Sequence, residues 1–329
     1  MAFLKRLGID TYMLLLIATV VLGVVLPVRG IFADGLKQVT FWAVALLFFL
    51  YGAKLNAAAV RAGLMNWRLQ ALTFVVTYAM FPILGLAITW AAGPLLTPET
   101  RLGILFLSVL PSTVQSSIAF TSMVGGNVPA AICAASVSNL VGVVLTPVLV
   151  TVILHQGGAT VQGDAAVKIA MQILLPFVIG QLLRRWIGGW VARHKTLTMV
   201  VDRGSILLIV YSAFSAGTVA GLWHVLSPAD LVTLYLVVVA FLALAMLAMA
   251  GLGRATGMAF EDRAVLFFCG STKSLASGLP IATALFPAAT LGAVVLPTML
   301  YHLSQLFVCA VVAQRGAARL AGEGAPARA

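Results

Sequence analysis

Long apolar runs follow one another along almost the whole chain, separated by short polar or basic segments. Most reach about 18 residues or more, the length at which a helix crosses the hydrocarbon core of a bilayer. A helix suits that environment because each of its backbone N–H and C=O groups pairs within the same segment. The pattern predicts an all-α membrane protein with ten spans. These are residues 11–28, 36–53, 69–92, 101–124, 127–154, 165–185, 203–222, 229–252, 263–286 and 289–313.

Short polar islands that contain a helix breaker interrupt the fourth and the ninth predicted spans. Ser112 and Thr113 follow Pro111 in LPSTVQSS, and a second Ser–Thr pair follows Gly270 in CGSTKSLASGLP. Ser112 and Ser271 are 159 residues apart. That offset divides the spans into two halves of five, and an odd number inserts the second half upside down. The pattern predicts two inverted repeats, 11–154 and 165–313, with broken crossing helices, as in many secondary transporters.

The broken spans predict a binding site where the half-helices meet near the middle of the membrane. Half-helix N-termini favour anions and C-termini favour cations. Each serine or threonine could instead bond only to its own helix or join two helices. For two matched clusters beside helix breakers we favour a site. The predicted substrate- or ion-binding residues are Ser112, Thr113, Gln115, Ser116, Ser117, Ser271, Thr272, Lys273 and Ser274.

Lys273 is predicted at bilayer depth, where a lysine costs about 2.5–3.5 kcal/mol. All nine acidic residues, Asp202 among them, are predicted at span ends or in loops, so no carboxylate accompanies it. Three functional interpretations stay open. The ammonium replaces a coupling cation and holds the crossing together, it binds an anionic substrate, or it cycles a proton. A structural interpretation ranks with the first and does not exclude it: the lysine bonds to carbonyl and hydroxyl groups freed at the break.

The tenth span contains a second ionisable side chain, His302, which is a candidate proton relay. Its alternative is a neutral ring bonded to a helix neighbour. Tyr301, Gln305 and Asn139 are further polar positions within spans, and bonding between helices explains them most simply.

The composition excludes an ordinary soluble domain. Hydrophobic residues make up 62% of the chain and charged residues 9%, whereas soluble domains average about 25% charged residues. The net charge of +11 suits basic loops better than a nucleic-acid partner. With both termini in the cytoplasm, 15 Lys and Arg residues fall inside and 4 outside, as the positive-inside rule requires. We expect a multi-pass protein of the bacterial inner membrane with cytoplasmic termini and a disordered tail at 316–329.

Two stretches carry a family resemblance: LPSTVQSSIAFTSMVGGNVPAAICAASVSNLVGVVLTPVLV and RAVLFFCGSTKSLASGLPIATALF. With the five-plus-five organisation, the chain resembles the bile acid:sodium symporter family over nearly its whole length. Its double serine, GGN and KSLASGLP motifs are most similar to the branch of sodium/bile acid cotransporter 7 and its bacterial relatives. The resemblance implies a panel domain (11–53 and 165–222) and a core domain (69–154 and 229–313) that alternate access to a solute.

The resemblance also implies sodium ligands, and most of these are replaced. Where sodium-coupled members carry an acid, a glutamine and an asparagine around the ninth-span glycine, this chain has Phe268, Thr272 and Lys273. Two hydroxyl residues expected after GGN are replaced by Ala131 and Ala135, while the double serine of the fourth span is kept. These replacements argue against sodium coupling in the usual manner.

We therefore predict a secondary active transporter of a small organic anion. The alternatives are a proton-coupled or uncoupled facilitator and a non-transporting membrane regulator. Motifs of metalloproteases, serine hydrolases and nucleotide-binding loops are missing from the sequence, so an enzyme is not expected. We expect no cofactor, contacts with membrane lipids, no nucleic-acid partner, and a monomer or homodimer.

Overall fold

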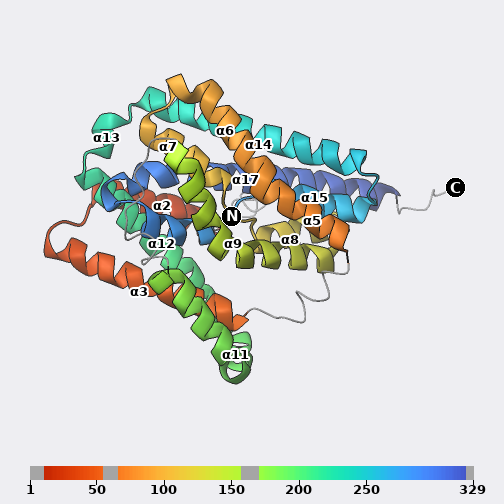
Figure 1. Cartoon of the computed structure of the whole chain (residues 1–329), viewed down its shortest axis with the longest axis horizontal. Helices are drawn as coiled ribbons and strands as arrows, with labels where there is room; N and C mark the ends of the chain where they lie inside the picture. Colours follow the sequence, from red (N-terminus) through yellow and green to blue (C-terminus); the bar gives the residue numbers. More distant parts are fainter. Residues whose placement is uncertain (1–10, 55–65, 157–169, 324–329) are drawn as a thin grey trace.

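The computed structural model describes residues 11–54, 66–156 and 170–323, and every regular element in these ranges is a helix (Figure 1). The first part contains α2 (Thr11–Val25), α3 (Ile31–Lys54), α5 (Trp67–Val75), the π-helical turn η1 (Val76–Met80), α6 (Phe81–Ala92), the 3-10 turn η2 (Gly93–Leu95), α7 (Pro98–Ser108), α8 (Gln115–Met123) and α9 (Val128–Gln156). The second part contains the π-helical turn η3 (Ala170–Leu174), α11 (Leu175–Arg193), α12 (Lys195–Val219), α13 (Leu222–Val225), α14 (Pro228–Ala255), α15 (Phe260–Ser271), α16 (Leu275–Leu285) and α17 (Ala288–Glu323).

Seven helical segments of the described residues are long and apolar enough to cross a membrane. They are Ile31–Lys54, Trp67–Leu95, Val128–Ile153, Lys195–Val219, Pro228–Ala255, Phe260–Leu285 and Ala288–Gly316. Each overlaps one predicted span. Of the other three predicted spans, the first contains the shorter apolar helix Leu14–Val25. The fourth is divided between α7 and α8, and the sixth begins in 157–169, outside the described residues.

Helices continue through two segments that the sequence analysis assigned differently. The predicted loop 186–202 is wrong, because α11 runs to Arg193 and α12 begins at Lys195. Basic residues do not end a helix, and arginine and lysine are good helix formers. The predicted disorder of 316–329 is also wrong as far as Glu323, where α17 ends. That stretch is rich in alanine and arginine, which favour a helix; residues 324–329 lie outside the described part.

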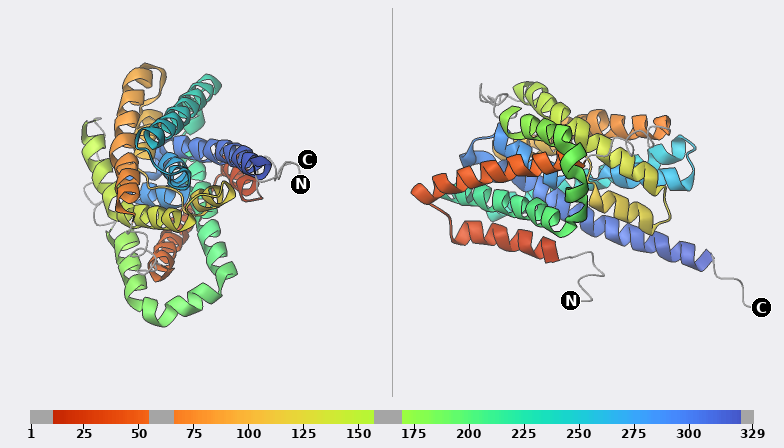
Figure 2. Two further views of the ribbon diagram at one scale, coloured as in Figure 1. Left: turned by 90° about the vertical axis from the view of Figure 1, so that its right-hand side faces the viewer. Right: turned by 90° about the horizontal axis from the view of Figure 1, so that it is seen from below.

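Two hydrophobic clusters fill the bundle. One joins α2, α3 and α12 to α7, α16 and α17, with Phe48, Phe106 and Phe214 fully buried. The other joins α5, α6, α14 and α15 to α17 and contains Phe81 and Phe241. Helix α17 therefore belongs to both, and it packs against α7, α12, α14 and α16. Figures 1 and 2 show α14 along one side of the molecule and α3 and α11 along another.

Helices α3 and α11 pack with their backbones in contact, because each helix has a glycine at the point of closest approach. A Cβ atom on Gly180 would lie 2.0 Å from the carbonyl oxygen of Phe49, and one on Gly52 would lie 2.1 Å from that of Phe177. Small residues let membrane helices approach this closely. The two glycines therefore set the distance between α3 and α11.

We expect Gly180→Ala to destabilise the protein by about 1–3 kcal/mol or more, because the added methyl group forces the two backbones apart. Gly189→Ala is the matched control on the same helix, since a Cβ there would meet no atom within 4 Å. The control should be neutral or slightly stabilising because alanine is the better helix former. Thermal unfolding in detergent measures both variants, and equal melting temperatures would contradict the assignment.

Candidate functional site

Each polar island contains a non-helical break, 109–114 between α7 and α8 and 272–274 between α15 and α16, and the two breaks meet inside the bundle. Helix α7 ends at Ser108 and α8 begins at Gln115, while α15 ends at Ser271 and α16 begins at Leu275. The backbone N–H of Ser274 donates to the carbonyl oxygen of Pro111 at 2.7 Å. The contact brings together the C-termini of α7 and α15 and the N-termini of α8 and α16. Residues 109–114 and 272–274 are called the crossing below.

Hydroxyl groups from both islands form one cluster around Thr272. Its Oγ1 lies 3.2 Å from the hydroxyl of Ser112, 3.0 Å from that of Thr113 and 2.8 Å from that of Ser117. Thr272 and Ser117 also donate to the carbonyl oxygen of Phe268, in the last turn of α15. All four hydroxyl side chains are buried. The cluster therefore ties the start of α8 to the end of α15.

The remaining predicted serines and Gln115 lie around the edge of this cluster. Ser116 is half-buried and donates to the Thr113 hydroxyl at 2.8 Å. Ser271 donates back to its own helix, and Ser274 caps α16 by accepting the N–H of Ser277. Gln115 is exposed on the first turn of α8. The structure thus brings the predicted hydroxyl residues to the crossing but leaves Gln115 outside their hydrogen-bond network.

The Lys273 side chain is 1% exposed and its ammonium is surrounded by backbone carbonyl oxygens. Nζ donates to Thr77 O at 3.0 Å, to Ser108 O at 3.0 Å and to Leu110 O at 2.7 Å. It also lies 4.0 Å from the centre of the Phe81 ring, a distance suited to a cation–π contact. An ammonium has three N–H donors, so the three carbonyls use all of them.

Two of these carbonyls are available because α7 ends just before the crossing. Pro111 has no N–H, and the N–H of Ser112 donates to the Ser138 hydroxyl at 3.1 Å. Neither residue can therefore continue the helical pairing of α7. The C-terminus of a helix also carries partial negative charge, which favours the ammonium at Ser108 and Leu110.

The third carbonyl is released by the π-helical turn η1. In a regular α-helix the N–H of Phe81 would pair with Thr77 O, but here it donates to Val76 O. Pro82, five residues after Thr77, has no N–H to offer in the π-helical register. Thr77 O would therefore be buried without a donor, which costs several kcal/mol in an apolar region. Thr77 is not among the residues predicted from the sequence, and Pro82 is the local signal that points to its free carbonyl.

The backbone of Lys273 is held by α17. Its N–H donates to Gln305 Oε1 at 2.8 Å, and Gln305 Nε2 donates to its carbonyl oxygen at 2.9 Å. The same Nε2 lies 2.9 Å from His302 Nδ1, and Tyr301 donates to the carbonyl oxygen of Ser271. His302 therefore lies next to Gln305, which holds the backbone of Lys273, and is not part of the hydroxyl cluster.

Helix α9 supports the crossing from another side. The amide of Asn139 donates to Ser112 O at 2.7 Å, and its Oδ1 accepts from the Ser277 hydroxyl. Tyr78 donates to the carbonyl oxygen of Ser138, next to the hydroxyl that binds the N–H of Ser112. Asn139 therefore joins both islands to α9.

The residues at the crossing do not fit a sodium ion bound in the usual manner of the family. At the expected positions, Phe268, Ala131 and Ala135 are buried and carry no side-chain oxygen. The Thr272 hydroxyl is engaged by other hydroxyls, and the Lys273 ammonium binds the carbonyls. Among the described residues, no group of three or more His, Cys, Asp or Glu side chains could hold a metal ion.

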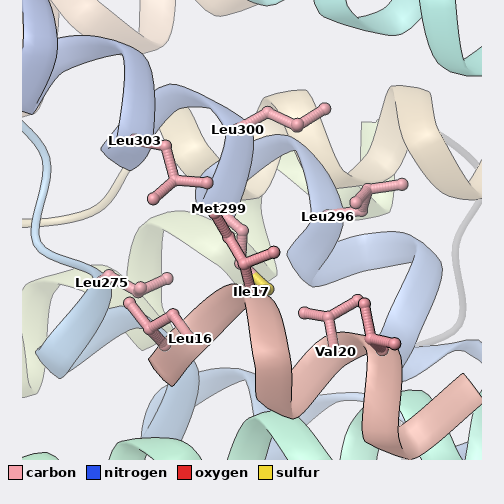
Figure 3. Close-up of a pocket in the computed structure, with 9 residues that line it drawn as sticks. Leu16, Ile17, Val20, Leu275, Leu296, Met299, Leu300 and Leu303 are labelled. Atoms are coloured by element: carbon pink, nitrogen blue, oxygen red, sulfur yellow. The ribbon is translucent and has the colours of Figure 1, made fainter. Parts of the chain in front are cut away.

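An apolar pocket of about 160 Å³ lies next to the crossing, between α2, α16 and α17 (Figure 3). Leu275, the first residue of α16, lines it directly after the crossing. The other lining residues are Leu16, Ile17, Val20, Val21, Leu296, Met299, Leu300 and Leu303. The pocket can hold an apolar group but offers no partner to a charge.

One carboxylate that the sequence places just outside a span lies within a helix. Asp202 is predicted just before the seventh span, but it lies inside α12, where Tyr51 of α3 donates to its Oδ1 at 2.7 Å. The difference arises because α12 begins at Lys195, with no helix breaker between the two positions. This hydrogen bond links α3 to α12 and is separate from the crossing.

The chain matches the SBF-like CPA transporter family over residues 10–318. It therefore belongs to this family, and the resemblance to bile acid:sodium symporters inferred from the motifs is confirmed. The chain is a multi-pass membrane transporter and not an enzyme.

Relatives match along almost the full length of the chain. "Uncharacterized protein PA2026" of Pseudomonas aeruginosa is 52% identical over 94% of this chain and 93% of its own. "Putative symporter YfeH" of Escherichia coli is 45% identical over 93% of this chain and 92% of its own. "Sodium/bile acid cotransporter 7" of Rattus norvegicus is 27% identical over 95% and 94%, respectively.

We expect Thr272→Val to destabilise the protein by about 1–3 kcal/mol, because the buried hydroxyls around Thr272 lose a shared partner. Thr283→Val is the matched control. Like Thr272, Thr283 donates to a carbonyl oxygen of its own helix region, that of Pro280, but it lies on α16 outside the cluster. Thermal unfolding in detergent compares the two, and an equal loss in both would show that the cluster adds nothing.

Proposed function

We propose that this protein is a secondary transporter of an amphipathic organic anion, working by alternating access without a sodium ion. The transport site is the crossing, and the two inverted repeats are 11–154 and 165–313. The observation that carries the proposal is the buried Lys273 ammonium on three backbone carbonyls. It places an ammonium where the resemblance implies a sodium site.

The ammonium and the missing ligands support the sodium-free part of the proposal together. A sodium ion would need oxygen ligands, and the nearest backbone carbonyls already accept from Lys273. Among the residues that the structure describes, no carboxylate pairs with the lysine, whereas the family pattern has an acid at the position of Phe268. A second cation beside the ammonium would be repelled. The name of the rat relative includes sodium, and we do not extend that property to this chain.

The balance of donors and acceptors favours an anionic substrate. The C-terminal ends of α7 and α15 present carbonyl acceptors at the crossing, and these already have donors. Lys273 donates to Ser108 O of α7. Tyr301 and Thr272 donate to carbonyl oxygens of α15. The N-terminus of α8 has no side-chain cap, and Gln115 and Ser116 on its first turn are exposed or half-exposed. Free helix N-termini favour negative charge. The apolar pocket beside Leu275 suits the apolar body of the same molecule.

A proton-coupled transporter is the second candidate. His302 hydrogen-bonds to Gln305, which holds the backbone of Lys273 on both sides. A change in the protonation of His302 would therefore affect the crossing through the side chain of Gln305. Under this alternative, uptake would accelerate with an inward proton gradient, and His302→Gln would abolish the acceleration while leaving uptake itself.

We further propose ten membrane crossings with both termini in the cytoplasm, supported by the 15-against-4 distribution of basic residues. The three natural cysteines are buried, which keeps background labelling low. We expect Ala329→Cys to react with an impermeant thiol reagent only after the cells are permeabilised. Phe32→Cys is the control: this residue is 77% exposed on the first turn of α3, at the predicted outer end of that helix, and should react in intact cells. Labelling of Ala329→Cys in intact cells would refute the topology.

Lys273→Met tests the role of the ammonium, because it keeps most of the volume and removes the charge. Three buried carbonyls would lose a donor, at about 1–3 kcal/mol each, so we expect a large drop in melting temperature and in transport. Lys195→Met, at an exposed position at the start of α12, is the matched control and should behave like the natural protein.

The same proteins should be screened against a panel of organic anions that includes bile acids, using ligand-induced thermal stabilisation followed by uptake. We expect equal affinity and uptake in sodium, potassium and choline. Saturable sodium stimulation of the natural protein, together with little effect of Lys273→Met, would overturn the proposal.

A further inference from the structure

A groove with three arginines lies between α14, α15 and α17, outside the hydroxyl cluster. Its volume is about 440 Å³. Arg254 comes from α14, Arg263 from α15 and Arg315 from α17, and all three line the same space. This arginine groove also includes apolar side chains, among them Phe260, Phe267 and Val312. It belongs to neither the predicted site nor the apolar pocket beside Leu275.

The three arginines have no acidic partner within the described part of the chain, where the recorded ion pair is Lys37 with Asp34. The acidic residues nearest to Arg263 in the sequence, Glu261 and Asp262, do not form ion pairs with these arginines. Asp262 accepts from the amides of Asn66 and Asn127, and Glu261 is exposed without an ion pair. Three cations thus share one groove with no charge to balance them, and this arrangement calls for an anion.

The chemistry of the groove points to a phosphate. Arginine presents a planar fork of donors that matches phosphate oxygens, and convergence of several arginines strengthens the match. Arg254 and Arg315 are exposed, so their guanidinium groups can reach a group at the membrane surface. Arg263 is half-buried, with its guanidinium carbon 6.0 Å from the centre of the Phe260 ring.

The apolar lining indicates that the phosphate belongs to a lipid and not to a soluble ion. Besides the arginines, Phe267 and Val312 line the groove. The same helices carry large exposed apolar side chains nearby: Leu247 on α14 is 68% exposed and Phe307 on α17 is 42% exposed. Such side chains suit contact with acyl chains. Basic pockets between membrane helices at the cytoplasmic side are also typical of anionic lipid sites.

We propose that the arginine groove binds one anionic phospholipid, with its phosphate on Arg254, Arg263 and Arg315 and an acyl chain along Phe267 and Val312. The site also touches the transport machinery. Phe268 lines the groove, and its carbonyl oxygen accepts from Ser117 and Thr272 at the crossing. The bound lipid therefore holds the end of α15 that supports the hydroxyl cluster. The proposal requires only that the protein lies in a membrane, and it stands whether or not the crossing transports an anion.

The test uses the full-length protein purified in a neutral detergent, with phosphatidylglycerol as the probe and phosphatidylcholine as the zwitterionic comparison. Native mass spectrometry counts bound lipid, and thermal unfolding measures stabilisation as lipid is added. We expect one tightly held phosphatidylglycerol and no equivalent phosphatidylcholine. The triple variant Arg254→Gln/Arg263→Gln/Arg315→Gln should weaken phosphatidylglycerol binding by about 10- to 100-fold.

A second triple variant, Arg68→Gln/Arg185→Gln/Arg193→Gln, removes the same charge from three exposed positions elsewhere and should leave the affinity within about 3-fold of the natural protein. Val312→Trp fills the groove while keeping its arginines, and it should weaken lipid binding as strongly as the groove triple. Equal losses in the two triple variants would overturn the proposal, since general charge would then explain binding. Stabilisation by glycerol phosphate equal to that by the lipid would also overturn it, because a soluble anion would then be the ligand.

Discussion

The ammonium of Lys273 must replace its water shell inside an apolar bundle, and the crossing is organised around this requirement. Three backbone carbonyls and an aromatic face take the place of water. A regular helix has no carbonyl to spare in its interior, so each acceptor depends on an interruption. Ser108 and Leu110 are freed where α7 ends, and Thr77 is freed by the π-helical turn before Pro82. The lysine and the breaks thus stabilise each other, because either alone would leave buried polar groups unpaired.

This arrangement has a consequence for energy coupling in the proposed transporter. A sodium ion binds and leaves, and its gradient can drive a cycle through that exchange. In the proposed cycle, an ammonium fixed by a covalent stem stays with the protein in both the inward-facing and the outward-facing state. It can organise the crossing and attract an anion, but it cannot carry free energy across the membrane unless it exchanges a proton. The driving force would then come from the gradient of the solute itself or from proton exchange through a group such as His302.

The polar groups at the crossing divide into a supporting set and an accessible set. Gln305, Asn139 and Tyr301 hold backbone groups of the islands, and the hydroxyl cluster ties α8 to α15. The first turn of α8 is more open, with Gln115 exposed and no side-chain cap. Most of the predicted hydroxyl residues therefore build the frame, and under the proposed function the solute meets the start of α8. In the proposed mechanism the frame moves as a unit, since its hydrogen bonds link four helix ends.

The sequence by itself determined the helical membrane class, the positions of the two interruptions and the presence of a deep lysine without an acid. These are local properties: hydropathy over the length of one helix, a proline or glycine within it, and a charge inside an apolar run. It also carried the family motifs, and the match to the family over residues 10–318 confirmed the class of transporter. The sequence did not determine the helix ends, because basic residues near 193 and 315 do not stop a helix.

Only the tertiary structure decided which groups receive the ammonium, since Thr77 and Lys273 are 196 residues apart in the chain. It likewise left Gln115 exposed and placed Asp202 against Tyr51. The partner of a buried polar group depends on how distant helices align, and no local pattern of residues encodes that alignment.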